Sequence, residues 1–265
     1  IIVNDAIEEL MACKKIKPYT VDGTTYLYER RMWESEKYIA SKLLLLDKVC
    51  PAVASADIKL FIENEERKYG FEYASMQKKA ISLSLESGVM LLTGGPGTGK
   101  TTIVKALLDI FNSMDMKVAL AAPTGRAAKK LSEATSYEAK TLHRLLEFDY
   151  CDGESGGPGF RRNETELLEE NVIIVDEASM IDNMLMSSLL KAVKPGARLI
   201  LIGDSDQLRS VGAGNILRDL LDSERFATVR LNEIFRQAQK SLIVTNAHRI
   251  NRGEMRLRFP GSCLT

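Results

Sequence analysis

The stretch Gly88-Val-Met-Leu-Leu-Thr-Gly-Gly-Pro-Gly-Thr-Gly-Lys-Thr-Thr102 decides the fold of this chain. Val89 to Thr93 form a short apolar run rich in strand-forming residues, and Ile103 to Phe111 repeat apolar residues at helical spacing. Between them, Gly94 and Gly99-Lys-Thr101 fit the phosphate-loop pattern G-x-x-x-x-G-K-[ST]. The strand before the loop and the helix after it disfavour the alternative, an ordinary glycine turn.

This loop has the residue types that phosphate binding requires. Small residues let backbone N–H groups close around phosphate oxygens, and the positive end of the following helix faces the anion. We expect Lys100 to reach the β- and γ-phosphates and the Thr101 hydroxyl to hold Mg²⁺. The predicted nucleotide-binding residues of the loop are Gly94, Gly95, Pro96, Gly97, Thr98, Gly99, Lys100, Thr101 and Thr102.

Composition limits the possible classes of protein. The 265 residues include 36 basic and 36 acidic ones, so the net charge neither favours nor excludes a nucleic-acid partner. Four scattered cysteines and two histidines argue against a disulfide framework or a zinc site and favour a reducing, cytoplasmic compartment. No apolar run approaches the length of a membrane span, and no signal peptide is recognisable. The chain begins at Ile1 rather than Met, so we expect a piece of a longer protein.

Residues 1–70 are predicted to form a separate N-terminal module, mainly helical, with one hairpin. Helical patterns cover 4–16, 31–46 and 56–69, and strand-prone residues at 19–28 flank a turn at Asp22-Gly23. Helices around a hairpin suggest a winged-helix-like module, which often binds DNA. The sequence shows no clear basic stripe here, so a packing or partner-docking role is at least as well supported.

From residue 71 on, buried strands alternate with helices, and polar residues follow the strand ends. Asp176 and Glu177 follow the apolar run 172–175, and they are expected to serve Mg²⁺ and the attacking water, respectively. Gln207 follows the strand at 198–202, together with Asp204 and Asp206, and can contact the γ-phosphate. Without the phosphate loop, each of these would be an ordinary polar strand end.

Several single residues have both a functional and a plain structural interpretation. Gln77, in a helix over 76–85 that Ser75 can cap, suits an adenine edge but could equally be solvated. Arg236 can stabilise charge on the phosphates or form a surface ion pair. The turn from Pro123 to Arg126 follows a strand at 117–122, where open α/β sheets bind ligands, or it simply starts a helix. His143 is a packing residue or a functional contact.

Residues 146–166 contain the least regular stretch. Two short alternating arms flank Asp152-Gly-Glu-Ser-Gly-Gly-Pro-Gly159, which has the composition of a turn. The pattern favours a projecting hairpin and a disordered surface loop about equally.

With these residues assembled, the chain resembles the RecD-like family of superfamily 1 DNA helicases, the exodeoxyribonuclease V alpha-subunit type. The resemblance covers residues 71–255 and rests on seven motifs in order, GGPGTGKTT, APTGRAAKKL, TLHRLLE, VIIVDEASM, LIGDSDQL, LNEIFRQ and NAHRINRGEM. It implies an α/β fold, a RecA-like P-loop motor lobe with a parallel sheet flanked by helices. It also implies ATP hydrolysis that drives 5′-3′ movement along single-stranded DNA and unwinding at duplex junctions, in recombination and repair.

The resemblance assigns further roles by position. Gln77 matches an adenine-contacting glutamine, Gln207 and Arg236 match γ-phosphate sensors, and the hairpin matches the pin that splits the duplex. Pro123, Thr124, Arg126 and His143 lie in motifs that the family associates with the DNA strand. Subunits of a nuclease complex are possible partners.

Two departures from the family pattern qualify this resemblance. Arg209 and Ala213 stand where the family usually has prolines, and nothing after Met255 resembles the second RecA-like lobe. Residues 256–265 are expected to be a tail or the start of that lobe. Without it, we expect the chain to bind nucleotide weakly and not to translocate.

A nucleotide-dependent binding switch without DNA translocation is the alternative function. The acidic and glutamine motifs suit either function, whereas the 123–126 turn, His143 and the hairpin are needed only by a DNA motor. A GTPase is disfavoured because no Asn-Lys-x-Asp motif occurs, and a nuclease because no metal cluster is separate from the phosphate loop.

Overall fold

Six parallel strands form the central sheet of the protein. The computed structural model describes residues 2–149, 159–207, 210–233, 242–251 and 253. The strands lie in the order β10-β3-β9-β8-β4-β5. Their bounds are β3 Val89–Gly94, β4 Val118–Ala122, β5 Ala139–Thr141, β8 Val172–Val175, β9 Arg198–Gly203 and β10 Ala227–Leu231.

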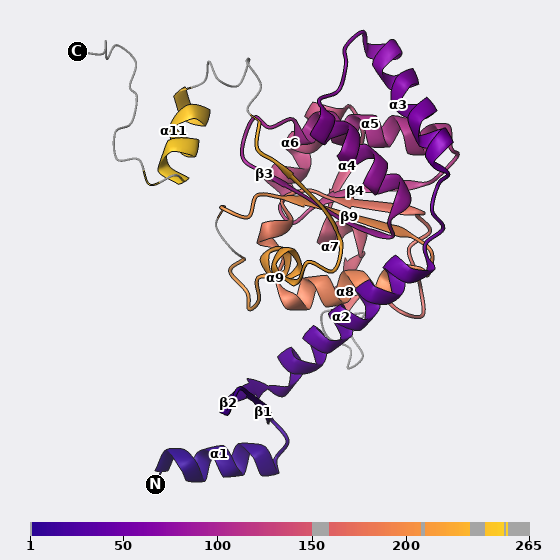
Figure 1. Cartoon of the computed structure of the whole chain (residues 1–265). Helices are drawn as coiled ribbons and strands as arrows, with labels where there is room; N and C mark the ends of the chain where they lie inside the picture. Colours follow the sequence, from indigo (N-terminus) through magenta and orange to yellow (C-terminus); the bar gives the residue numbers. More distant parts are fainter. Residues whose placement is uncertain (1, 150–158, 208–209, 234–241, 252, 254–265) are drawn as a thin grey trace, which may run out of the picture.

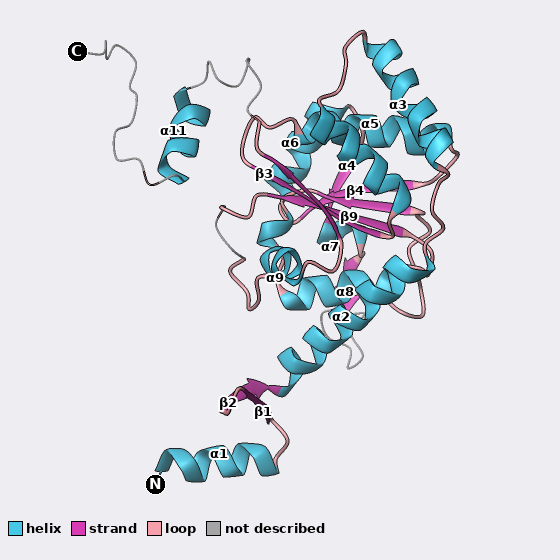
Figure 2. Cartoon of the chain, in the orientation of Figure 1, coloured by secondary structure: helices cyan, strands magenta, loops and turns pink. Residues whose placement is uncertain are grey.

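Helices cover both faces of this sheet, as Figure 2 shows. One face packs against α3 (Ser55–Tyr69), α4 (Ser75–Glu86), α5 (Lys100–Ser113) and α6 (Gly125–Thr135). The other face packs against α2 (Arg30–Val49), α7 (Leu142–Leu145), α8 (Asn183–Ala192) and α9 (Ile216–Ser223). A short 3-10 turn, Ala178–Met180, precedes α8, and α11 (Leu242–Asn251) lies apart from the sheet (Figure 1).

The two cores explain the continuous apolar runs in the sequence. Along β3, Val89 and Leu91 belong to the core on the α2 side, whereas Met90 and Leu92 belong to the core on the α5 side. A strand buried on both faces needs apolar residues at every position rather than at alternate ones. The predicted α/β class with a parallel sheet flanked by helices is therefore confirmed. The strand β5 was not predicted, because three residues are too few to show a period.

The chain before the sheet forms an arm that projects from the lobe (Figure 1). The arm comprises α1 (Ile2–Ala12), the hairpin of β1 (Ile16–Val21) and β2 (Thr24–Glu29), and the first turns of α2. The predicted turn at Asp22-Gly23 is present, with left-handed φ values of 48° and 76°. Farther along α2, Ile39, Leu43 and Leu46 enter the core of the sheet. The module boundary at residue 70 therefore stays a prediction.

Where α2 ends, it is fastened to the amino ends of the strands. Asp47 Oδ1 accepts hydrogen bonds from the backbone N–H groups of Gly88 (3.1 Å) and Val89 (2.9 Å). A Cβ at Gly88 would lie 2.4 Å from the Leu46 carbonyl oxygen, so only glycine permits this approach. Arg198, 1% exposed, donates to the carbonyls of Ser87 (2.8 Å) and Pro51. Burial lowers the pKa of the Arg198 guanidinium.

Two short strands confirm that the arms of the irregular stretch pair with each other. β6 (Phe148–Asp149) and β7 (Gly159–Phe160) are antiparallel, with Phe148 opposite Phe160. Glu147 anchors the base of this hairpin through Arg162, with 2.8 Å between Oε1 and Nη2. The tip, 150–158, and the predicted tail, 256–265, lie outside the described residues.

Two of the four cysteines, Cys13 and Cys50, are described, and both are free thiols. Cys151 and Cys263 lie outside the described residues. Within the described part of the chain, every helix is too short or too polar to cross a membrane.

Candidate functional site

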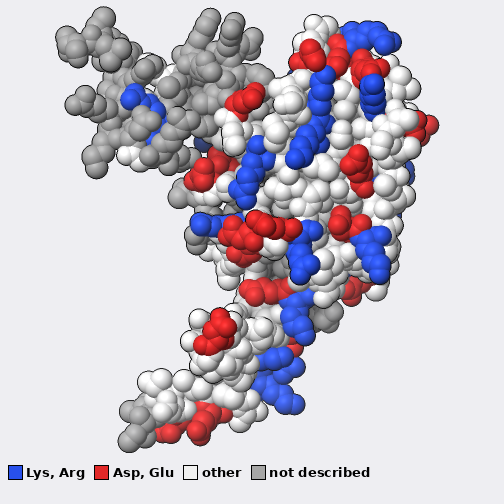
Figure 3. Space-filling view, in the orientation of Figure 1, with Lys and Arg blue, Asp and Glu red and all other residues white. Residues whose placement is uncertain are grey.

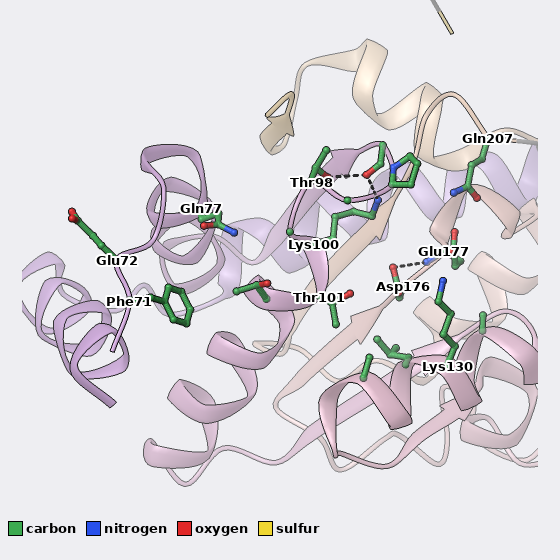
Figure 4. A pocket seen from close by; sticks show the side chains of 18 residues that line it. Phe71, Glu72, Gln77, Thr98, Lys100, Thr101, Lys130, Asp176, Glu177 and Gln207 are labelled. Carbon is green, nitrogen blue, oxygen red and sulfur yellow. Dashed lines mark hydrogen bonds between the residues drawn. The ribbon is translucent and has the colours of Figure 1, made fainter. Parts of the chain in front are cut away.

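A pocket of about 980 Å³ opens at the carboxyl ends of the central strands. In Figure 4, Phe71 and Gln77 lie at one end of it, Asp176, Glu177 and Lys130 at the other, and Thr101 between them. All the predicted loop residues from Gly95 to Thr102 line the pocket, as do Gln77, Asp176, Glu177 and Gln207. Residues from separate segments of the chain, 77 to 207, thus meet in one cavity.

Glycines give the phosphate loop its shape. Gly97 and Gly99 have φ values of 77° and 86°, in the left-handed region that disfavours side chains. A Cβ at Gly94 would lie 2.7 Å from Thr98 Oγ1 and 2.9 Å from the Leu231 carbonyl oxygen, because β10 runs beside this position. The Thr98 hydroxyl donates to the Gly95 carbonyl at 2.9 Å and so closes the loop. The helix α5 then begins at Lys100.

Lys100 lies within the curve of the loop. Its ammonium group donates to the carbonyl oxygens of Gly94 and Gly95, the latter at 3.1 Å. Burial lowers the pKa of Lys100, and the nearby carboxylates of Asp204, Asp176 and Glu177 act in the opposite direction. A partly desolvated ammonium group is well suited to an anion, since its field is weakly screened there.

Asp176 and Glu177 follow β8, as predicted. The Asp176 N–H donates to the Ala121 carbonyl at 2.9 Å, and Asp176 Oδ1 accepts from the Glu177 N–H at 2.9 Å. Burial raises the pKa of both carboxyls, and the charge of Asp176 raises that of Glu177 further.

The backbone of Glu177 has an unusual conformation. Its φ of 54° and ψ of 39° are left-handed, which is uncommon for a residue with a side chain. Such backbone strain tends to occur at functional sites, where the surrounding structure holds it in place. The sequence gives no sign of it.

The end of β9 completes this side of the pocket. Gln207 lines the pocket and is exposed, while its N–H donates to the Asp204 carbonyl at 3.2 Å. Asp204 itself is buried, and Thr93 Oγ1 accepts from the Ser205 N–H at 3.3 Å, which ties β9 to β3. Arg236, predicted to lie over the phosphates, lies outside the described residues.

Gln77 is buried rather than solvated. It is 4% exposed, and its Oε1 accepts a hydrogen bond from the Ala74 N–H at 3.0 Å. The helix begins with Ser75 itself, so the prediction that Ser75 caps it is wrong; Ala74 precedes the helix and Gln77 binds its backbone. Because the side-chain oxygen of Gln77 is held by this hydrogen bond, its side-chain nitrogen points toward the pocket (Figure 4). Phe71, not predicted here, adds an aromatic ring at the same end.

Lys130 is a second pocket residue that the sequence did not single out. It lies on α6, lines the pocket, and its charge acts on Asp176, Glu177 and Lys100. Its neighbour Lys129 points elsewhere and pairs with Glu133 at 4.0 Å. The two lysines are neighbours in the sequence, but successive residues of a helix point in different directions. The positions of the apolar residues of α6 show which side of the helix is buried, and could therefore have told the two lysines apart.

The residues predicted to contact DNA lie along the next strands of the sheet. Pro123 and Thr124 follow β4, and Thr124 Oγ1 caps α6 by accepting from the Ala127 N–H at 3.2 Å. Arg126 is exposed on the first turn of α6. His143 on α7 is also exposed, and its ring lies 5.7 Å from Phe148 and 5.6 Å from Phe160. It therefore packs on the hairpin base and still presents an edge to solvent.

Comparison with known proteins agrees with this geometry. A family model described as an AAA domain matches residues 72–260. The chain is 38% identical over 234 residues to the ATP-dependent RecD2 DNA helicase of Deinococcus radiodurans. This alignment covers 88% of this chain and 31% of that protein. It belongs to the RecD-like DNA helicase family.

A second RecD-like relative gives the same result. Identity to the RecBCD enzyme subunit RecD of Mycobacterium tuberculosis is 42% over 220 residues, 74% of this chain and 36% of that protein. The solved structure of Pif1 helicase from Candida albicans aligns with 24% identity and a TM-score of 0.49, over 67% of this chain and 44% of that one. The chain thus spans about a third of the length of these curated RecD relatives.

The pocket of this RecD-like chain has donors suited to a nucleotide with Mg²⁺. The loop offers backbone N–H groups and the Lys100 ammonium for phosphates, and the AAA domain implies nucleotide binding. Among the described residues, no three His, Cys, Asp or Glu side chains cluster as a metal site. Magnesium often takes only one or two protein ligands and the substrate phosphates for the rest, which Thr101 and Asp176 fit.

Proposed function

We propose that this chain is the first motor lobe of an ATP-dependent DNA helicase that moves 5′-3′ on single-stranded DNA in recombination and repair. The observation that carries ATP hydrolysis in this proposal is the gathering of Lys100, Thr101, Asp176, Glu177 and Gln207 around one pocket. The RecD-like family of the chain supports DNA as the partner of that hydrolysis. That set combines phosphate binding, magnesium binding, water activation and γ-phosphate contact, which together amount to hydrolysis rather than binding alone.

In this proposal, each pocket residue has a defined task. The loop N–H groups and Lys100 hold the phosphates, and Thr101 and Asp176 hold Mg²⁺, which offsets negative charge on the phosphates. Glu177 orients a water molecule and accepts its proton. Gln77 and Phe71 hold the base, and Gln207 and Arg236 contact the γ-phosphate.

The helix α6 connects the pocket with the proposed DNA path. Thr124 caps its start, Arg126 lies on its first turn, and Lys130, on its second turn, lines the pocket. A shift of α6 would therefore move both ends at once. We propose that Pro123, Thr124, Arg126 and His143 contact the strand, and that the hairpin at 146–166 separates the duplex.

The relatives point to two settings for this activity. One is named as a helicase and others as RecBCD subunits. We propose that the natural protein unwinds DNA, with the subunits of a nuclease complex as its candidate partners.

Strand displacement by the purified natural protein tests the proposal. With ATP, a duplex with a 5′ single-stranded tail should be unwound, and a matched duplex with a 3′ tail should not. Loss of unwinding in Lys100→Ala is the control for ATP dependence. Equal unwinding of both duplexes would contradict the direction, and no unwinding of either would favour the binding switch.

A further inference from the structure

A second hollow, in the arm, collects basic side chains that are scattered in the sequence. Its volume is about 460 Å³, and it lies between the end of α1, the strand β1 and the start of α2. Its charged lining comprises Lys14, Lys17, Arg30, Lys37 and Glu34. Four cations and one carboxylate give it a net charge of +3, in a chain whose overall net charge is zero.

The fold creates this concentration of charge. Arg30, Glu34 and Lys37 lie on one face of α2, at spacings of four and three residues, and the hairpin brings the earlier lysines beside them. Glu34 pairs with Arg30 at 2.7 Å, whereas Lys14, Lys17 and Lys37 form no ion pair with any of the described residues. The acidic residues of α1 do not line the hollow; Figure 3 shows acidic side chains at the tip and on one side of the arm, and basic ones along the other side.

Aromatic rings lie beside these cations. Trp33, in the wall of the hollow, packs against Tyr19 and Tyr28, with ring centroids 4.8 Å and 5.2 Å away. The register of the hairpin places Lys17, Tyr19, Tyr26 and Tyr28 on one face of it, toward Trp33. Lys17 Nζ lies 5.0 Å from the centre of the Trp33 ring. Tyr19 and Tyr26 remain 45% and 50% exposed.

We propose that the arm binds single-stranded nucleic acid, with phosphates in the hollow and bases on the exposed tyrosines. Sequence-independent single-strand sites combine a cationic groove with aromatic rings on which unpaired bases stack. A duplex keeps its bases stacked inside and would leave the rings unused. The site is separate from the motor lobe and requires no ATP, so it would hold the strand while the lobe changes its grip.

The fluorescence of Trp33 tests this proposal directly, because Trp33 is the only tryptophan in the chain. Unlabelled oligothymidylate of about 15 nucleotides, within the length range of such sites, should change its emission on titration into the 265-residue chain. Strand bound only at the motor lobe would leave it unchanged. The apparent affinity should fall as salt rises.

Charge variants separate this site from general attraction. The double variant Lys14→Gln with Lys37→Gln should bind oligothymidylate roughly tenfold more weakly. The slope of log affinity against log salt concentration should fall in magnitude by about 1.4, which is about 0.7 for each phosphate that the variant no longer neutralises. The matched control is Lys59→Gln with Lys117→Gln, two exposed lysines on the lobe, and it should change neither value. Unchanged thermal melting of both variants shows that they fold.

Four outcomes would overturn the proposal. Trp33 emission could fail to respond to oligothymidylate, or both lysine pairs could weaken the titration equally. An equal response to polyglutamate would show that the hollow takes acidic polypeptides instead. Binding that is unaffected in Arg126→Ala with His143→Ala would further support a site independent of the motor lobe, and its loss there would contradict that independence.

Discussion

The two edges of the central sheet are built in opposite ways. At the carboxyl edge, β3, β8 and β9 end in glycines, carboxylates and a left-handed Glu177 around an open pocket. At the amino edge, Asp47, Gly88 and Arg198 join the end of α2 to the strands through part-buried hydrogen bonds. The carboxyl edge holds its polar groups ready for a ligand, whereas the amino edge uses its polar groups within the fold.

This difference predicts that variants at the carboxyl edge lose activity but keep their stability, and that variants at the amino edge lose stability but keep nucleotide binding. A polar group at the carboxyl edge that awaits a ligand can be removed with little loss of fold. Removing a polar side chain at the amino edge leaves the backbone groups that it bound without a partner. This lowers the free energy of unfolding.

Lys100→Ala should show the largest effect. Loss of the phosphate-binding ammonium group should lower the ATP hydrolysis rate of the natural protein by at least about a hundredfold. Its free energy of unfolding should change by less than about 1 kcal/mol, measured by urea unfolding. A large loss of stability would show that the two edges are not separable in this way.

Arg198→Leu should have the reverse profile. The carbonyls of Ser87 and Pro51 lose their donor, so the variant should be less stable by about 1–3 kcal/mol, with a melting temperature lower by roughly 2–12 °C. Nucleotide affinity, measured well below melting, should be unchanged. Arg218→Leu is the matched control, since its exposed pair with Asp222 at 3.6 Å should contribute little. Equal melting of the two variants would contradict the structural role of Arg198.

Gly94→Ala should affect both properties, because this glycine belongs to the loop and also lies against β10. The added methyl group would lie 2.9 Å from a backbone oxygen, so we expect a destabilisation of about 1–3 kcal/mol and weaker nucleotide binding. Gly125→Ala is the control at the same edge, since a Cβ there meets nothing within 4 Å. Equal stability and equal nucleotide binding of the Gly94→Ala and Gly125→Ala variants would contradict a role for the close contact between Gly94 and β10.

Lys130→Met should give the smallest effect. An exposed cation near phosphates contributes about 0.5–1 kcal/mol, so nucleotide affinity should fall roughly two- to fivefold. Lys129→Met, one residue earlier and facing away from the pocket, should leave affinity unchanged. Calorimetric titration with ATP measures the affinity of each variant. Equal affinities would show that Lys130 does not contribute to nucleotide binding.

The carboxyl edge was largely predictable from sequence, and the amino edge was not. Lys100 and Thr101 lie in a contiguous motif, and Asp176, Glu177 and Gln207 follow recognisable apolar strands, whose ends must meet in a parallel sheet. Asp47, Gly88 and Arg198 share no motif, and their contacts depend on how α2 docks. The cationic hollow of the arm was missed for the same reason, since its lysines come from separate segments.

Local features with short-range causes were also missed. The left-handed backbone of Glu177 follows from the turn after β8, and the cap of α4 is formed by Gln77 rather than by Ser75. Both depend on hydrogen-bond geometry that residue types alone do not specify. Arg236 and the hairpin tip remain predictions, because they lie outside the described residues.

The rate of ATP hydrolysis by the natural protein, with and without single-stranded DNA, tests the central claim most directly. If this lobe belongs to a DNA motor, single-stranded DNA should raise the rate, and Lys100→Ala should remove both the basal and the stimulated hydrolysis. An ATPase rate that single-stranded DNA leaves unchanged would contradict the motor and leave a nucleotide-dependent binding switch.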